Sequence, residues 1–270
     1  MTVRKDAILW PIRFDATSYG VRVTIDLTPE TLTLNVSTGR NYFVSGDGQA
    51  DAATDGGLGD LVKMFEDLLD SHSAASGAGS FTVSVTDDGQ LSIQNNMAGS
   101  AQNWSIDWTN AASTLDHTIF GFLEANYSHT AGLIEAPKKT RGVWYPDRTR
   151  AIDSRDRQPT VGAVAETISG LSRASRLVAP KKTREIGWRL VPQAKALDEY
   201  ADSTEPYGSF ESAWVNALSY GYSFRVYDDA SERTASAYEL YRVRSLSDPM
   251  QRSPEPVRFE IDLGLVRADD

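Results

Sequence analysis

The chain has 270 residues, of which 40% are hydrophobic and 24% charged, and its formal net charge is −10 at neutral pH. This composition is typical of a folded globular protein and too apolar for an intrinsically disordered one. The absence of cysteine excludes disulfide frameworks, thiolate catalysis and cysteine-bound zinc. Because no window approaches 18 consecutive apolar residues, the sequence predicts no transmembrane helix.

The charges are unevenly distributed along the chain. Residues 1–135 hold 6 lysines and arginines against 17 aspartates and glutamates, a net charge of −11, whereas residues 136–270 hold 21 against 20, a net charge of +1. This change predicts a boundary between two modules near residue 135. Because contacts to phosphates dominate nucleic-acid affinity, the acidic first half argues against a DNA- or RNA-binding role. We expect no sequence-specific nucleic-acid partner.

The first half predicts short β-strands around one helix. Apolar and polar residues alternate at 22–27 and at 31–36, as in half-buried strands, and the segment NYFVS follows them. We expect Asp55 or Gly59 to cap the helix in DLVKMFEDLLDSH, and Asp60 to interact with the positive end of its dipole. The apolar residues of this segment recur at helical spacing on one face: Leu58, Leu61, Phe65, Leu68 and Leu69.

A β-hairpin is the clearest local prediction. In SFTVSVTDDGQLSIQNN, residues 80–96, two alternating segments flank DDG, whose glycine supplies the positive φ angle of a tight turn. WSIDW, at 104–108, extends the pattern to another strand. The segment TLDHTIFGF then closes the unit with a small apolar plug formed by Leu115, Ile119, Phe120 and Phe122.

The second half predicts strands and two helices. The stretch 161–178 is ambiguous between helix and strand, and we expect an extended structure. REIGWRLVP indicates a strand that ends at Pro192, and a short helix is expected in QAKALDEYA. A helix is predicted over 209–220, with Ser209 at its N-cap and Gly221 at its C-cap. Three alternating strands, YSFRVYDD, YELYRVRSL and RFEIDLGLVR, complete the chain.

Together these elements predict a β-rich α+β protein with two modules, each a small antiparallel sheet, barrel or sandwich with one packed helix. The first module, residues 1–135, ends in the TLDHTIFGF plug. The second module, residues 136–270, is a β-sandwich or barrel that carries the helix at 209–220.

The hexapeptide APKKTR occurs twice, at 136–141 and at 179–184, each time shortly before a tryptophan. The flanking residues share little else, which argues against a duplicated unit. We interpret both copies as basic segments leading into strands, whose side chains cover an edge or contact the acidic half of a neighbouring subunit. The predicted interface residues are Lys138, Lys139, Arg141, Arg155, Arg157, Lys181, Lys182 and Arg184.

Arg155 and Arg157 belong to the charged loop DSRDR. Forked guanidinium groups in such a loop can form a phosphate or carboxylate clamp. The alternative is ion pairing with the neighbouring aspartates or with another subunit, and we favour ion pairing.

No catalytic or cofactor motif is evident, because the sequence lacks HExxH, GxxxxGK[ST], GxSxG and a strand-linked GxGxxG. Asp116 beside His117 can be a catalytic dyad, although a cap or a surface pair is the simpler interpretation. The aspartates of 47–60 are oxygen ligands of the kind calcium prefers, but they lack the EF-hand spacing, and we interpret this segment as a solvated loop. We predict no enzyme activity, cofactor or metal.

Several segments in combination resemble virion proteins of tailed bacteriophages and prophages. STLDHTIFGF, preceded by a helix and the VSVTDDGQLSIQN hairpin, is similar to a small module of such proteins, and GVWYPDRTRAIDSRDRQPTVGAVAETISG is similar to the segment that follows it. FESAWVNALSYGYSFRVYDD, YELYRV and RFEIDLGLV resemble the end of phage tail proteins. The resemblance covers the chain from about residue 20 and is carried by the combination of segments rather than by any single one.

This resemblance implies a non-enzymatic, distal-tail-like or tail-tube-like tail component that assembles in the host cytoplasm and resides in the virion tail. It leaves open whether the ring lies at the distal tail, in the tail tube, at the periphery of the baseplate hub or at the neck. It implies a ring homo-oligomer, a hexamer or a trimer, in contact with neighbouring tail proteins and without a membrane partner. An acidic inner surface of such a ring repels DNA phosphates. The alternative is a carbohydrate- or receptor-binding accessory protein of the virion, in which Trp104, Trp108 and the Asp-rich loop contact a glycan.

Overall fold

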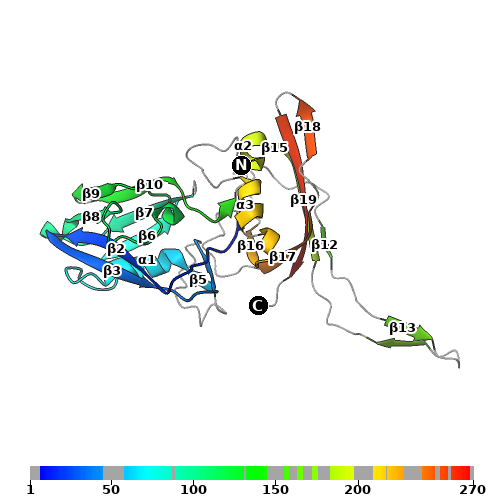
Figure 1. The fold of residues 1–270 in the computed structure, drawn as a ribbon, viewed down its shortest axis with the longest axis horizontal. Coiled ribbons are helices and arrows are strands. Elements are labelled where there is room, and N and C mark those ends of the chain that lie inside the picture. The colour runs from blue at the N-terminus through cyan, green and yellow to red at the C-terminus, as the bar shows by residue number, and fades with distance from the viewer. Residues whose placement is uncertain are drawn as a thin grey trace.

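The structure is a computed structural model that describes residues 7–44, 58–86, 89–130, 132–144, 155–157, 163–166, 172–175, 183–197, 209–216, 218–227, 239–246, 250–254 and 257–267. It is β-rich with few helices, and its sheets are antiparallel except for one short parallel pair, as an α+β protein of the predicted kind requires (Figure 1).

Four antiparallel strands form one sheet in the first half, in the order β3-β2-β8-β9, and three form another, in the order β10-β7-β6. The predicted strands near residues 22–36 are confirmed as a hairpin whose two turn residues, Asp26 and Leu27, both have positive φ. The predicted hairpin at 80–96 is confirmed as β6 and β7. These strands are β2 (Ser18–Ile25), β3 (Thr28–Asn35), β6 (Phe81–Val85), β7 (Gln90–Asn95), β8 (Asn103–Asp107), β9 (Asn126–Thr130) and β10 (Leu133–Lys139).

Helix α1 (Leu61–Asp70) packs against β3 and β6 and buries the predicted face of Leu61, Phe65, Leu68 and Leu69. Leu58, which was predicted to lie on the same face, lies in a strand before the helix. The N-cap of α1 is Asp60, whose carboxylate accepts a hydrogen bond from the Val62 amide at 3.0 Å. The prediction of a cap at Asp55 or Gly59 was therefore wrong: Gly59 lies in β5 (Leu58–Asp60), which pairs with β4 (Asn41–Phe43). Asp60 follows this strand directly and offers the carboxylate that glycine lacks.

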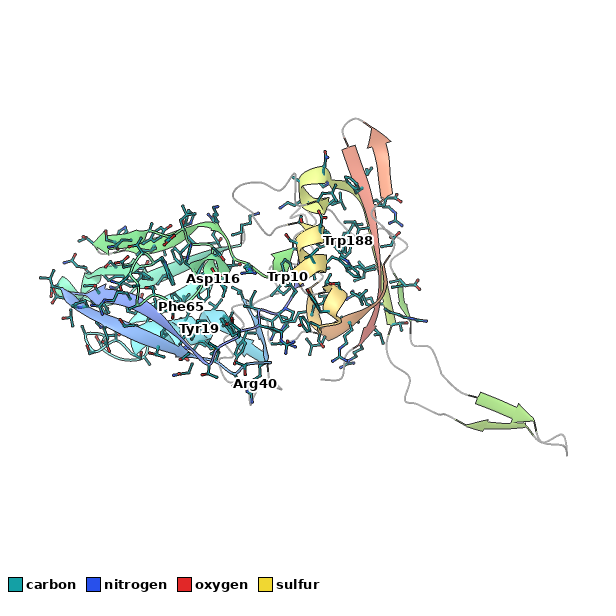
Figure 2. All side chains as sticks on the ribbon, in the orientation of Figure 1. Trp10, Tyr19, Arg40, Phe65, Asp116 and Trp188 are labelled. Atoms are coloured by element: carbon teal, nitrogen blue, oxygen red, sulfur yellow. The ribbon has the colours of Figure 1, made fainter. Side chains whose placement is uncertain are left out.

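A large hydrophobic cluster, which we call the first core, fills the space between these two sheets and α1. The predicted plug lies in it: Leu115, Ile119, Phe120 and Phe122 are all buried. Phe65 of α1 stacks on Phe120, with ring centroids 4.6 Å apart. Figure 2 shows Phe65 within this group of elements. The plug therefore packs directly against α1 within the first core.

The second group of elements is an eight-stranded sheet with the path β11-β1-β16-β17-β19-β15-β12, beside which β18 pairs with β19. The predicted strands at 184–192 and near the end of the chain are confirmed in β15, β16, β17 and β19. The strands are β1 (Ala7–Leu9), β11 (Val143–Trp144), β12 (Arg155–Arg157), β15 (Thr183–Pro192), β16 (Phe224–Tyr227), β17 (Glu239–Leu246), β18 (Met250–Pro254) and β19 (Val257–Arg267).

A second hydrophobic cluster, which we call the second core, packs on this sheet. Trp188 and Trp144 are fully buried and meet edge to face at 5.0 Å. Helices α2 (Gln193–Ala196) and α3 (Phe210–Asn216) contribute to it, and a 3-10 turn, η4 (Leu218–Tyr220), follows. The predicted caps of the 209–220 segment are present: Ser209 Oγ accepts from the Ser212 amide, and Gly221 has a φ of 70°.

The two cores do not follow the predicted division of the chain at residue 135. That position falls inside β10, and the early residues Ile8 and Trp10 belong to the second core. Strand β1 lies between β11 and β16, so the first core is formed by a segment inserted between two neighbouring strands of the larger sheet. Strands that pair in one sheet can come from segments far apart in the sequence, and a count of charges along the chain does not detect such pairing.

Strands β13 (Ala163–Glu166) and β14 (Ser172–Ser175) form a two-stranded hairpin, as the expected extended structure for this stretch requires. Within the described part of the chain they pair only with each other. Figure 1 shows them apart from the rest of the molecule, beyond β12.

Candidate functional site

The predicted interface residues of the first APKKTR copy lie at the end of β10 and just after it. Lys138 and Lys139 are half-buried. The Lys138 amide donates to the Gly121 carbonyl at 3.0 Å, and the Arg141 amide donates to the Ile119 carbonyl at 2.9 Å. Backbone hydrogen bonds therefore hold this copy against the plug of the first core, and it is not a freely solvated segment.

The remaining predicted interface residues are dispersed. Arg155 and Arg157 lie in β12, and Arg184 lies in β15, where it is in register with Asp156 of β12. Lys181 and Lys182 lie outside the described residues. The structure thus places Arg155, Arg157 and Arg184 on the last two strands at one side of the eight-stranded sheet, and it places the Lys138–Arg141 group elsewhere, beside the plug.

A groove of about 480 Å³ lies where the two cores meet. One wall is the segment 10–15, which runs from β1 into the first core, and Figure 2 shows Trp10 at this junction. The plug supplies Asp116 on a second side, and Tyr220 and Tyr222 supply the third. Ligand pockets of this size at the junction of two units are common in proteins.

Aromatic rings and a guanidinium group are layered at one end of the groove. Tyr220 and Tyr222 stack with centroids 5.6 Å apart and an interplanar angle of 22°. The Arg13 guanidinium carbon lies 4.6 Å from the centroid of Tyr222, in a cation–π contact. The ring of Tyr220 is 67% exposed, so this layered group presents an open aromatic surface.

A hydrogen-bonded pair and an ion pair line the other walls. The Tyr19 hydroxyl donates a hydrogen bond to Asp15 Oδ1, and this bond lowers the pKa of Asp15 below its ordinary value. Partial desolvation and the same bond raise the pKa of Tyr19. At neutral pH Asp15 is therefore a carboxylate and Tyr19 a neutral phenol. Across the groove, Arg141 contacts Asp116 Oδ2 at 3.0 Å.

The geometry gives no support to Asp116 and His117 as a catalytic dyad. Asp116 Oδ1 accepts from the Thr118 amide at 3.0 Å and caps a 3-10 turn, η2 (His117–Phe120), while Oδ2 pairs with Arg141. The interpretation of Asp116 as a cap and a surface pair is confirmed. Among the described residues no group of three or more histidines, aspartates or glutamates is placed to hold a metal ion. Most of the Asp-rich segment 47–60 lies outside the described residues.

The two tryptophans expected to contact a glycan are not surface groups. Trp104 is 3% and Trp108 4% exposed, and both belong to the first core. That part of the prediction was wrong, because both residues occupy the inward positions of an alternating strand or pack against Phe65 and Phe122. The sequence analysis missed the roles of Arg13, Asp15 and Tyr19, since no local motif shows that segment 10–15 crosses between two cores.

Comparisons with protein-family models, with curated proteins and with solved structures find no match to this chain. None of the helices in the described residues is long and apolar enough to span a bilayer.

Proposed function

We propose that this protein is a non-enzymatic structural subunit of the tail of a bacteriophage or prophage, a distal-tail-like protein that forms a ring or adaptor. It assembles in the host cytoplasm as a homo-oligomer, a hexamer or a trimer, and contacts neighbouring tail proteins in the virion. Sequence resemblance motivates the family, and the architecture supports a protein whose role is to bind other subunits.

The single observation that supports assembly best is the β13–β14 hairpin. In the described residues it pairs with no other strand, and it stands apart from both cores in Figure 1. An isolated two-stranded hairpin is at best marginally stable in water, and it needs further strands or a packed surface. A partner subunit supplies such a surface.

The presence of two separate cores supports the finer proposal of two modules. Each core has its own buried aromatic residues, Phe65 and Phe120 in the first and Trp144 and Trp188 in the second. Two modules joined at a groove are suited to an adaptor, because each can face a different neighbour.

The proposed location is tested in particles purified after phage growth or prophage induction. We expect mass spectrometry to detect this chain in purified tails, and a labelled antibody against it to bind at the tail in electron micrographs. Absence of the chain from intact, purified particles would contradict the proposal.

A second candidate function is carbohydrate or receptor binding by the virion, and the exposed Tyr220 at the groove is the observation that favours it. An open aromatic face beside Asp116 and Arg141 can stack on a sugar ring while the charged groups bond its hydroxyls. A glycan array compares the wild-type protein with Tyr220→Ala and with Val215→Ala, an exposed apolar residue of α3 that does not line the groove. Binding that is lost only in Tyr220→Ala supports this function. If the wild-type protein binds no glycan on the array, carbohydrate binding is excluded.

A further inference from the structure

Strand β3 is an open edge of the four-stranded sheet at the first core. It pairs with β2 on one side, and in the described part of the chain no strand pairs with its other side. Figure 1 shows β3 at the lower margin of that sheet. The ladder between β2 and β3 runs without a bulge along the whole of β3, so the open edge is long and regular. A regular open edge is a template for pairing with another chain.

The turn of the β2–β3 hairpin determines which backbone groups of β3 point toward the open edge. Asp26 and Leu27 both have positive φ and form a two-residue loop, which makes Ile25 and Thr28 a hydrogen-bonded pair. Because the direction of the backbone groups alternates along a strand, every second residue of β3 bonds to β2. The residues whose backbone groups point to the open edge are therefore Pro29, Thr31, Thr33 and Asn35.

Three of these residues offer both a donor and an acceptor. Pro29 has no amide hydrogen, so the complete sites are those of Thr31, Thr33 and Asn35. All three residues are exposed, and within the described residues no hydrogen bond reaches their amides or carbonyls. A single copy therefore presents a row of solvated backbone groups that a second strand can bond.

The edge of the other sheet at the first core shows how this protein covers an edge. Strand β6 is an edge of the sheet β10-β7-β6, and carboxylates of α1 bond its outward amides. The Phe81 amide donates to Asp70 at 2.8 Å, and the Val83 amide donates to Glu66 at 2.9 Å. Helix α1 also packs against β3, but none of its carboxylates bonds the outward amides there. One edge is thus covered by acceptors and the other is open.

The exposed residues of β3 carry no charge, although edges that avoid pairing commonly carry lysine or another charged residue. Glu30, the one charged residue of the strand, is only partly exposed and accepts a hydrogen bond from the Ser73 amide at 2.8 Å. The first 135 residues have a net charge of −11, so two copies generally repel each other in this region. An uncharged edge lets two copies approach without placing like charges opposite each other.

We propose that the β3 edges of two copies pair in antiparallel orientation about a two-fold axis and join their sheets into one. The register that uses all three complete sites places Thr33 opposite Thr33 of the second copy, and Thr31 opposite Asn35 of the second copy. Each opposed pair exchanges two hydrogen bonds, about six in all, and Pro29 lies outside the ladder. The same surface serves both copies, so the contact is isologous.

This contact goes beyond the proposed ring, because a two-fold contact does not close a ring but joins two rings. The number of copies rests on the proposed function: two trimeric rings joined at β3 contain six copies. Each ring presents three β3 edges, so three short ladders act together, and their combined affinity exceeds that of one ladder.

The test places like charges on the two-fold axis and measures the mass of the full chain by multi-angle light scattering in about 0.1 M salt. In Thr33→Lys and in Thr33→Glu, like charges face each other from residues whose Cα atoms are about 5.5 Å apart. Each variant alone is expected to halve the mass, from six copies to three. An equimolar mixture is expected to return to six copies, because lysine then opposes glutamate.

The matched controls are Ser128→Lys and Ser128→Glu. Ser128 is exposed on β9, the strand at the other end of the same sheet, so these changes add the same charges away from β3. Both controls are expected to keep the mass of the wild type. Recovery of the mass in the mixture of Thr33 variants shows in addition that both are folded.

Amide hydrogen exchange at residue resolution locates the contact on β3. In the wild type we expect the Thr31 and Thr33 amides to be protected, and in Thr33→Lys we expect the Thr31 amide and that of residue 33 to exchange at least about tenfold faster. The Leu32 and Leu34 amides point toward β2, so they are expected to keep their protection in both proteins.

The outcomes separate the β3 contact from the ring. Equal masses of wild type and Thr33→Lys overturn the β3 contact and leave the ring proposal standing. A mixture that keeps the lower mass, although both variants melt as the wild type does, also overturns the β3 contact, and so does rapid exchange of the Thr31 amide in the wild-type assembly. A wild type of two copies that Thr33→Lys reduces to one supports the β3 contact and overturns the ring. A wild type that is monomeric at every concentration overturns both.

Discussion

The first core and the second core are built in opposite ways. The sheets around the first core combine hairpins between neighbours in sequence, β2 with β3 and β6 with β7, with the longer-range pairs β2 with β8 and β7 with β10, and all of these strands lie within residues 18–139. The second sheet joins strands from both ends of the chain, and β1 pairs with β11 and β16. Because its strands come from one continuous stretch of the chain, the first core is a candidate for independent folding, whereas the second core requires both ends of the chain. The first core is thus a unit inserted into a scaffold whose strands come from both ends of the chain.

Removing an aromatic ring from each core tests this difference with the largest expected effect. Phe65→Ala deletes a fully buried ring that stacks on Phe120, and it is expected to destabilise the first core by about 3–5 kcal/mol. Trp188→Ala is the matched change in the second core, where the ring meets Trp144. Urea unfolding followed by circular dichroism is expected to show two transitions, with each variant shifting a different one.

Equal shifts of a single transition in both variants would show that the two cores unfold as one unit. The inserted-unit interpretation would then be wrong, although the fold would be unchanged.

Gly121 tests the link between the plug and β10. Its φ is +79°, and an added Cβ would lie 2.1 Å from the Lys138 carbonyl oxygen, so the backbone must move. We expect Gly121→Ala to cost about 2–4 kcal/mol in the free energy of unfolding. Gly77→Ala is the control, because Gly77 also has a positive φ, +100°, but no atom lies within 4 Å of its added Cβ. A similar loss in both variants would assign the effect to φ alone.

The start of α1 is a test with a smaller effect. Asp60→Ala removes the carboxylate that bonds the Val62 amide, and it is expected to destabilise the first core by about 1 kcal/mol. Asp60→Asn keeps an oxygen acceptor and is expected to retain most of the stability. Chemical denaturation at neutral pH measures both. Equal losses in the two variants would show that the charge of Asp60, rather than the cap, is what matters.

The smallest predicted effect is a pH dependence at Glu30. Hydrogen bonds from Ser73, the backbone amide first, lower the pKa of this carboxyl below its ordinary value of 4.5. Since the folded-state pKa is the lower one, the contribution to stability is complete above about 4.5 and is lost as pH falls through the folded value. Unfolding of wild type and Glu30→Gln across this range is the measurement. The difference between them is expected to shrink toward low pH, and a constant difference would contradict the linkage.

Sequence periodicity predicted most of the individual strands and helices, but it did not predict how they pair and pack. The strands at β2, β3, β6 and β7, the helix α1 and the plug are local patterns of burial, and they appear where they were predicted. The pairing of β1 with β16 is not a local pattern, so the junction between the cores could not be predicted.

The groove was missed for the same reason. Tyr220 and Tyr222 come from the second half of the chain, while Arg13 and Asp15 come from its beginning. No spacing along the sequence brings these residues together. The burial of Trp104 shows the converse: an aromatic residue at an inward strand position belongs to a core, and its residue type alone does not indicate a ligand.

Native mass spectrometry of the wild-type chain at low salt tests the central claim most directly. A closed ring predicts one dominant species, at three times the mass of the chain for a trimer or six times for a hexamer, that stays fixed as protein concentration rises. A chain that remains monomeric at every concentration would contradict the account, and so would a continuous series of masses that grows with concentration, because neither describes a closed ring.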